Sequence, residues 1–354
     1  MRAVRLIVAS AVIAGLVAGS PMLPGAVSDW RLHLAADDPV RLSQLRLDAV
    51  ATPERLGAEI DAAVTAQDPD LADSLLTLAA ERGIAVSQER LAAVSALREG
   101  GVLRSAGEFG RGFLIGERES DAGFIGALAG DVTGFGDLRD IAQEGGKLLG
   151  GEQADETVLV LSAVGLAITA ATWISLGGGL PARGGLSALK TASKAKLLSP
   201  KLTAHLGRAA AGALDRPALA AGMGAIARLD LAAAKTAARG VVRPAAVRGF
   251  AALGQDAGAI YARTGQRGLR QVLAVADDAG DIRKAARLAA AKPSTARATF
   301  KLLGRSALVL GAFSLSAAGW MLWLVLYAIA LAMAAQRFGW WLGRVGRRRR
   351  EAHG

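Results

Sequence analysis

The sequence TVLVLSAVGLAITAATWISLGGGLPA occupies residues 157–182 and contains no charged side chain. As a helix, residues 157–176 would be roughly 30 Å long, which matches the hydrocarbon core of a bilayer. Three glycines at 177–179 and then Pro181 end the helix. This stretch therefore predicts a central membrane helix.

The net charge changes sign across this stretch. Residues 29–156 hold 12 Lys and Arg against 24 Asp and Glu, a net charge of −12. Residues 183–305 hold 22 against 6, a net charge of +16, so the overall charge of +11 combines two opposite regions. We expect a membrane to separate an acidic region from a basic one.

The composition favours an all-α fold. Hydrophobic residues make up 52% of the chain but aromatic residues only 5%, so helices would pack mainly through small aliphatic side chains. Cysteine is absent, which excludes disulfides, thiolate metal sites and Cys nucleophiles. The predicted fold class is all-α: a small exported helical bundle, membrane helices and a basic Ala-rich helical region.

Residues 1–28 read as a signal peptide or an N-terminal anchor. Arg2 and Arg5 precede a charge-free stretch at residues 6–27, and small residues follow its apolar part, as is typical of a secretory signal. The alternative is an uncleaved anchor, which the GxxxG spacing of Gly15 and Gly19 favours. In both cases the following region is exported.

Residues 29–100 predict an acidic helical bundle. Asp38, Thr52 and Asp68 each precede a proline, which places an N-cap residue before Pro at the first helical position. Ser87 is the expected N-cap of a fourth helix, and Gly83 stands where a helix C-terminal glycine belongs.

Residues 101–156 form a Gly-rich connecting region with a group of acids, Asp131, Asp137 and Asp140. Such acids could hold a hard cation through oxygen ligands, but their spacing does not match an EF-hand loop. Helix capping by Asp137, with Asp140 three residues later, explains them better. No metal site and no cofactor are expected.

The C-terminal membrane segment is predicted at residues 306–343. Its charge-free part, 306–336, would be about 46 Å long as one helix, so it must tilt, emerge or turn back. Ala312, Ser316 and Gly319 form a small-residue face that would suit a homo-oligomer. The expected membrane-interface aromatics are Trp320, Trp323, Tyr327, Trp340 and Trp341. The tail, 344–354, contains Arg347, Arg348, Arg349 and Arg350, expected to fix topology or bind anionic lipid.

The flanking charges leave three arrangements open. The acidic flank before residue 157 and the basic flank after residue 182 orient the central helix with its N-terminal end outside. Because both flanks of the last segment are basic, that segment forms either a re-entrant hairpin or a single crossing. In the third arrangement residues 183–305 stay outside, the central helix only dips into the membrane, and the last segment crosses inward. Residues 29–156 are periplasmic in all three.

No catalytic constellation is visible. His33, His205 and His353 are far apart, and no HExxH, phosphate-binding loop or nucleophile elbow occurs. The basic region 183–305 contains few aromatics, which favours contact with anionic lipid over nucleic-acid recognition.

Residues 106–190 resemble a family of uncharacterised bacterial inner-membrane proteins. The likeness lies in a GDxxGxGDxRD segment at residues 130–140, a following Leu-Gly-Gly step and the apolar helix. The segment is also distantly similar to pre-toxin segments of polymorphic toxins. Neither resemblance implies an activity or catalytic residues.

We therefore expect a non-enzymatic integral protein of the bacterial inner membrane that presents a helical interaction surface in the envelope. Its partners would be the lipid bilayer, with anionic lipids, and a protein. The alternative is a membrane-active effector that inserts apolar helices into a target bilayer.

Overall fold

The computed structural model describes residues 31–32, 34–99, 135–174, 180–228, 230, 233, 240–309, 327, 336, 339 and 340. The chain divides into two units, and every element below belongs to the unit Asp38–Val309. Its described part consists of helices and an isolated antiparallel bridge between Leu214 and Val242, which confirms the all-α prediction. Among the described residues, none of the helices combines the length and apolar character required to span a bilayer.

The N-terminal bundle follows the predicted helix starts. It contains α3 (Pro39–Val50), α4 (Pro53–Thr65), α5 (Pro69–Glu81) and a helix at residues 88–99. Asp38, Thr52 and Asp68 each accept a backbone N–H of the next turn, and Ser87 accepts the N–H of Arg90 at 3.4 Å. Gly83 adopts φ 64°, a left-handed conformation that suits glycine after a helix. The predicted capping in this bundle is confirmed.

The central apolar stretch forms α9 (Glu156–Ile174), which lies among α8 (Phe135–Leu149), α10 (Leu180–Lys194), α11 (Pro200–Ala213) and α14 (Pro244–Val275). Seven consecutive residues, 158–164, are buried. Because seven residues cover two full turns, α9 is enclosed on all sides in this segment. The predicted helix exists, but its surroundings here are other helices of the same unit.

Helix α14 crosses α10 at a pair of glycines. A Cβ on Gly185 of α10 would lie 1.8 Å from the carbonyl oxygen of Gly254, and a Cβ on Gly254 would lie 2.4 Å from that of Ala182. The two backbones therefore touch, which only glycine permits. About two thirds of the way along, α14 bends at Gly265, where φ is 68°.

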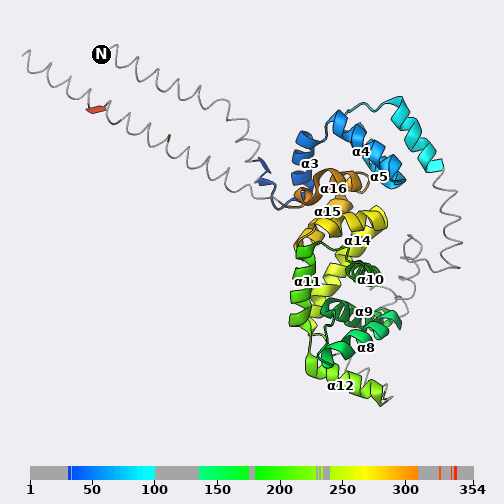
Figure 1. The fold of residues 1–354 in the computed structure, drawn as a ribbon. Helices are drawn as coiled ribbons and strands as arrows, with labels where there is room; N and C mark the ends of the chain where they lie inside the picture. Colours follow the sequence, from blue (N-terminus) through cyan, green and yellow to red (C-terminus); the bar gives the residue numbers. More distant parts are fainter. Residues whose placement is uncertain are drawn as a thin grey trace, which may run out of the picture. The chain divides into compact units, whose positions relative to one another are not determined.

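After α14 the chain returns to the N-terminal bundle. Helices α15 (Ala279–Ala291) and α16 (Ala296–Leu303), with the 3₁₀ turn η2 (Gly304–Ala307), pack on α3 and α5. Figure 1 shows α16, near the end of the described chain, lying beside α3, near its start. Helix α12 (Arg216–Ala227) packs on α8. The acidic bundle and the end of the basic region therefore form one packed body.

Candidate functional site

A cluster of buried charges joins α8 to α10. Lys190 Nζ lies 2.5 Å from Asp137 Oδ1 and 3.2 Å from Asp140 Oδ2, and Lys194 Nζ lies 2.7 Å from the same Asp140 oxygen. Arg183 Nη2 is 3.4 Å from Asp137 Oδ2. Apart from Lys194, these side chains are at most 4% exposed.

The cluster also contacts the backbone of α9. Arg183 Nη1 donates to the carbonyl oxygen of Gly165 at 2.9 Å. A Cβ on Gly165 would lie 2.6 Å from Asp137 Oδ2, so glycine is what admits the carboxylate to this face of α9. The buried charges therefore link three helices, α8, α9 and α10, to one another.

The electrostatics keep Asp140 ionised. Burial by itself raises the pKa of a carboxyl, but hydrogen bonds and charge from Lys194 and Lys190 outweigh burial and lower the pKa of Asp140. Such a carboxylate is a poor proton carrier near neutral pH. The cluster links α8 to α10 and, through the contact of Arg183 with Gly165, to α9.

Asp137 and Asp140 both lie within α8, whereas the sequence predicted Asp137 at the position before the helix. Asp137 lies in the first turn of α8, which begins at Phe135, so it is not the N-cap residue. Asp140 lies one turn further on and faces the same cations. The N-cap interpretation of Asp137 is wrong because α8 starts at Phe135, three residues before the first helical position that an N-cap at Asp137 would give. Asp131 lies outside the described residues.

A second set of charges forms the seam between the bundle and the end of the basic region. Arg297 of α16 donates from both terminal nitrogens to the two carboxylate oxygens of Asp68, each at 2.7 Å. The side chains are 4% and 9% exposed. Burial raises the pKa of Asp68, but Arg297 and the N–H of Leu71 outweigh it and lower that pKa.

Further contacts extend this seam in both directions. Lys292 Nζ lies 3.4 Å from Glu81 Oε2, and Lys301 Nζ lies 3.6 Å from Glu59 Oε2. A basic side chain of the N-terminal bundle also contacts the C-terminal helices: Arg55 donates to the carbonyl oxygen of Leu302 at 3.1 Å. Acidic side chains of the N-terminal bundle thus neutralise basic side chains of the C-terminal helices.

Arg46 attaches the end of this unit to α3. Its Nη1 donates to the carbonyl oxygen of Val309 at 2.9 Å and to that of Ser306. These carbonyls follow α16 and stand at the beginning of the apolar segment 306–336.

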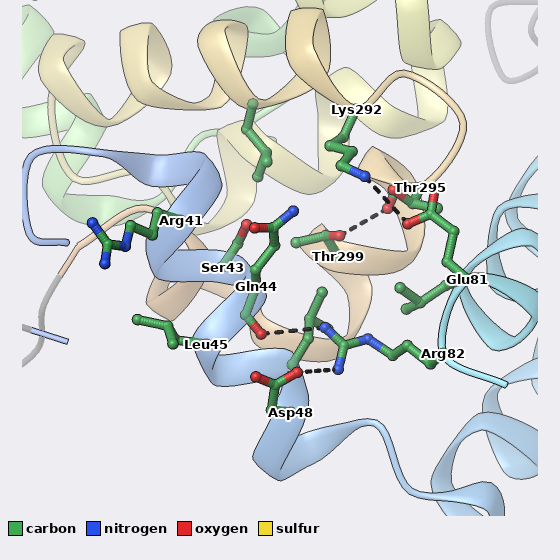
Figure 2. Close-up of a pocket in the computed structure, with 13 residues that line it drawn as sticks. Arg41, Ser43, Gln44, Leu45, Asp48, Glu81, Arg82, Lys292, Thr295 and Thr299 are labelled. Atoms are coloured by element: carbon green, nitrogen blue, oxygen red, sulfur yellow. Dashed lines mark hydrogen bonds and ion pairs between the residues drawn. The ribbon is translucent and has the colours of Figure 1, made fainter. Parts of the chain in front are cut away.

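A cleft of about 880 Å³ opens along the seam (Figure 2). Polar and charged side chains of α3, α5, α16 and the turns beside them line it, together with Leu45, Leu47, Leu78 and, from α15, Leu288. In Figure 2, Arg82 reaches Asp48 and the carbonyl of Gln44, and Lys292 reaches Glu81. The labelled lining residues are Arg41, Ser43, Gln44, Leu45, Asp48, Glu81, Arg82, Lys292, Thr295 and Thr299.

The membrane-related residues named from the sequence are mostly outside the described part. Trp340 is described and 68% exposed, and Tyr327 is described and partly buried. Outside it lie Trp320, Trp323, Trp341, Arg347, Arg348, Arg349 and Arg350. In the described residues no group of three or more His, Asp or Glu side chains is arranged to hold a metal ion.

Sequence reasoning missed Arg183, Lys190 and Arg297. The four-residue spacing of Lys190 and Lys194 on α10 is the signal that would have matched Asp137 and Asp140, three residues apart on α8. Comparison with known proteins adds no further identification, because no family model, curated protein or solved structure matches this chain.

Proposed function

We propose that this chain is a non-enzymatic protein of the bacterial inner membrane that presents its helical unit as an interaction surface on the periplasmic side. The observation that carries the proposal is the buried pair between Asp68 and Arg297. A bilayer cannot pass between two side chains in hydrogen-bonding contact. The acidic bundle and the end of the basic region therefore belong to one compartment.

This pair weighs against two of the three arrangements open from the sequence. The hairpin and the single crossing both require a central helix that crosses the membrane, which would put Asp68 and Arg297 on opposite sides. The third arrangement keeps both regions outside. The enclosure of residues 158–164 by other helices supports one common side for both regions. It differs from the third arrangement in one respect, because this segment of α9 packs within the unit instead of dipping into the membrane.

The charges at the two ends of the chain agree with a periplasmic unit. Arg2 and Arg5 precede the first apolar stretch, and four arginines, 347–350, follow the last one. If both basic ends are cytoplasmic, the positive-inside rule is met at each end. The basic region 183–305 does not oppose this, because long domains are translocated largely regardless of their charge.

An interaction role fits the chemistry of the described unit better than catalysis. The acids considered from the sequence as possible cation ligands, Asp137 and Asp140, are buried and paired with basic side chains. The cleft along the seam is open and combines charged and polar side chains with four leucines, a mixed lining that is suited to recognition.

The test uses the absence of cysteine in the natural chain. The Oγ of Ser74 accepts the backbone N–H of Ala298 at 3.0 Å, so S74C with A298C places two thiols across the seam. We expect this full-length variant to form an intramolecular disulfide in intact cells, because the periplasm is oxidising. The pair S74C with R208C is the control, since Arg208 lies on α11, which does not contribute to the seam.

Two measurements complete the experiment. The protein should stay with membranes after carbonate extraction, and a phosphatase fused after Gly354 should be inactive because the tail is cytoplasmic. Free thiols at both positions in intact cells, with a disulfide only after lysis and oxidation, would place the unit in the cytoplasm and refute the proposal.

A further inference from the structure

The cleft of Figure 2 has two walls that come from opposite ends of the described unit. Arg41, Gln44, Leu45 and Asp48 follow one another at helical spacing along one face of α3. Lys292, Thr295 and Thr299 lie in or beside α15 and α16 and form part of the facing wall. Its volume, about 880 Å³, falls within the range of small-molecule sites.

Arg41 is the lining residue that the fold explains least. It is exposed and lies in the first turn of α3, where a positive charge opposes the helix dipole. Among the described residues, no ion pair or hydrogen bond involves its guanidinium group. Because this cation opposes the helix dipole and has no counter-ion in the described part of the chain, it favours binding of an anion from outside the protein.

The rest of the cleft is suited to hydroxyl groups rather than to a second anion. Arg82 is paired with Asp48 at 2.6 Å, and Lys292 with Glu81 at 3.4 Å, so these four charges are balanced locally. They still offer unused donor and acceptor positions, because Asp48 is 67% and Glu81 41% exposed. The Gln44 side chain adds an amide, and Leu45 adds a half-buried apolar surface.

The position of the walls in the chain indicates where such a ligand would come from. Helix α3 begins at Pro39, soon after the apolar residues 6–27, and η2 ends at Ala307, within the apolar segment 306–336. Helix α3 contacts η2, and Arg46 on α3 holds the carbonyl of Val309. Both apolar segments thus join the unit at elements that contact each other, and α3 also lines the cleft.

We propose that this cleft binds the headgroup of an anionic glycerophospholipid, with the phosphate on Arg41 and the headgroup hydroxyls on Gln44 and the Glu81–Lys292 pair. This inference rests on the proposed function, because it requires the unit to lie against a membrane. Phosphatidylglycerol has the required chemistry: one phosphodiester charge next to a polyol. An acidic protein segment is the competing occupant, but it offers few hydroxyls for the paired end of the cleft.

The test measures lipid binding to the purified full-length protein in detergent by native mass spectrometry. The probes are phosphatidylglycerol, the zwitterionic phosphatidylcholine, and glycerol 3-phosphate as a soluble headgroup. The variant is R41Q, which removes the charge from an exposed position, and the matched control is R208Q, also an exposed arginine, on α11 outside the cleft.

We expect R41Q to bind phosphatidylglycerol about tenfold more weakly than the wild type, as the loss of one charge-assisted hydrogen bond predicts. R208Q should bind like the wild type, and phosphatidylcholine should bind weakly to all three. Equal phosphatidylglycerol binding by R41Q and wild type would overturn the lipid site. Glycerol 3-phosphate binding as tightly as the lipid, or displacement of the lipid by an acidic peptide, would overturn the lipid as its ligand. If carbonate extraction still leaves the protein in the membrane, these outcomes do not affect the proposed function.

Discussion

Replacing Arg297 by Met tests the seam most directly. The substitution keeps a long side chain but leaves the Asp68 carboxylate, only 9% exposed, without its bidentate partner. Removing one member of a buried ion pair costs about 3–5 kcal/mol. Two contacts of Asp68 remain, because Arg267 Nη1 lies 3.7 Å away and the N–H of Leu71 donates at 3.1 Å. We therefore expect a loss near the lower limit, about 3 kcal/mol.

The assay is thermal unfolding of the full-length protein in mild detergent, followed by circular dichroism. For a unit of this size, about 3 kcal/mol corresponds to a fall in Tm of about 6–12 °C. The matched control is K301M in the same seam, where the pair with Glu59 is 3.6 Å long and the lysine is 41% exposed. Such exposed pairs contribute about 0–1 kcal/mol. Equal Tm values for R297M and K301M would refute the reasoning that the buried pair joins the two regions.

Three further predictions concern the helix contacts and the buried acids. In α14, G254A should lower Tm sharply, because the added Cβ would lie 2.4 Å from a backbone oxygen. The control G249A, on the same helix, adds a Cβ that meets nothing within 4 Å, so it should leave Tm unchanged or raise it. In α9, G165A should destabilise the unit by about 1–3 kcal/mol by displacing Asp137, while G184A in α10 meets nothing within 4 Å and should not. Acid unfolding should be less steep in D140N than in wild type: the folded pKa of Asp140 is lowered, so its stabilisation is fully present above about pH 4 and is lost as pH falls through that lower pKa.

The local structure of the N-terminal bundle could be predicted because its signals are local. An N-cap residue followed by proline specifies a helix start through contacts with the next turn, as at Asp38, Thr52 and Asp68. No distant residue is needed for this effect. The same reasoning was wrong at Asp137, where α8 begins three residues earlier than an N-cap there would give, and the carboxylate is attracted to Lys190, 53 residues away.

The candidate cleft could not be predicted because its walls are distant in sequence. Arg41 and Thr299 come together only after α14 has crossed α10 and brought α16 back to α3. That crossing depends on the contact between Gly185 and Gly254. The periodicity of either helix shows which face is apolar, but it does not identify the other helix.

The opposite charges of the two halves illustrate how one pattern supports two physical explanations. A net charge of −12 before the central helix and +16 after it is what a membrane crossing predicts under the positive-inside rule. The same imbalance is expected of two regions that bind each other within one chain, since complementary charges favour their association. The two explanations differ in where the charges are: topology requires them only near the membrane ends, whereas association requires them at the contact. Asp68 with Arg297, Glu81 with Lys292 and Glu59 with Lys301 all lie at the contact. Association within the unit therefore accounts for this part of the charge partition. Under the proposed function, the positive-inside rule applies only to the basic residues near the two ends of the chain.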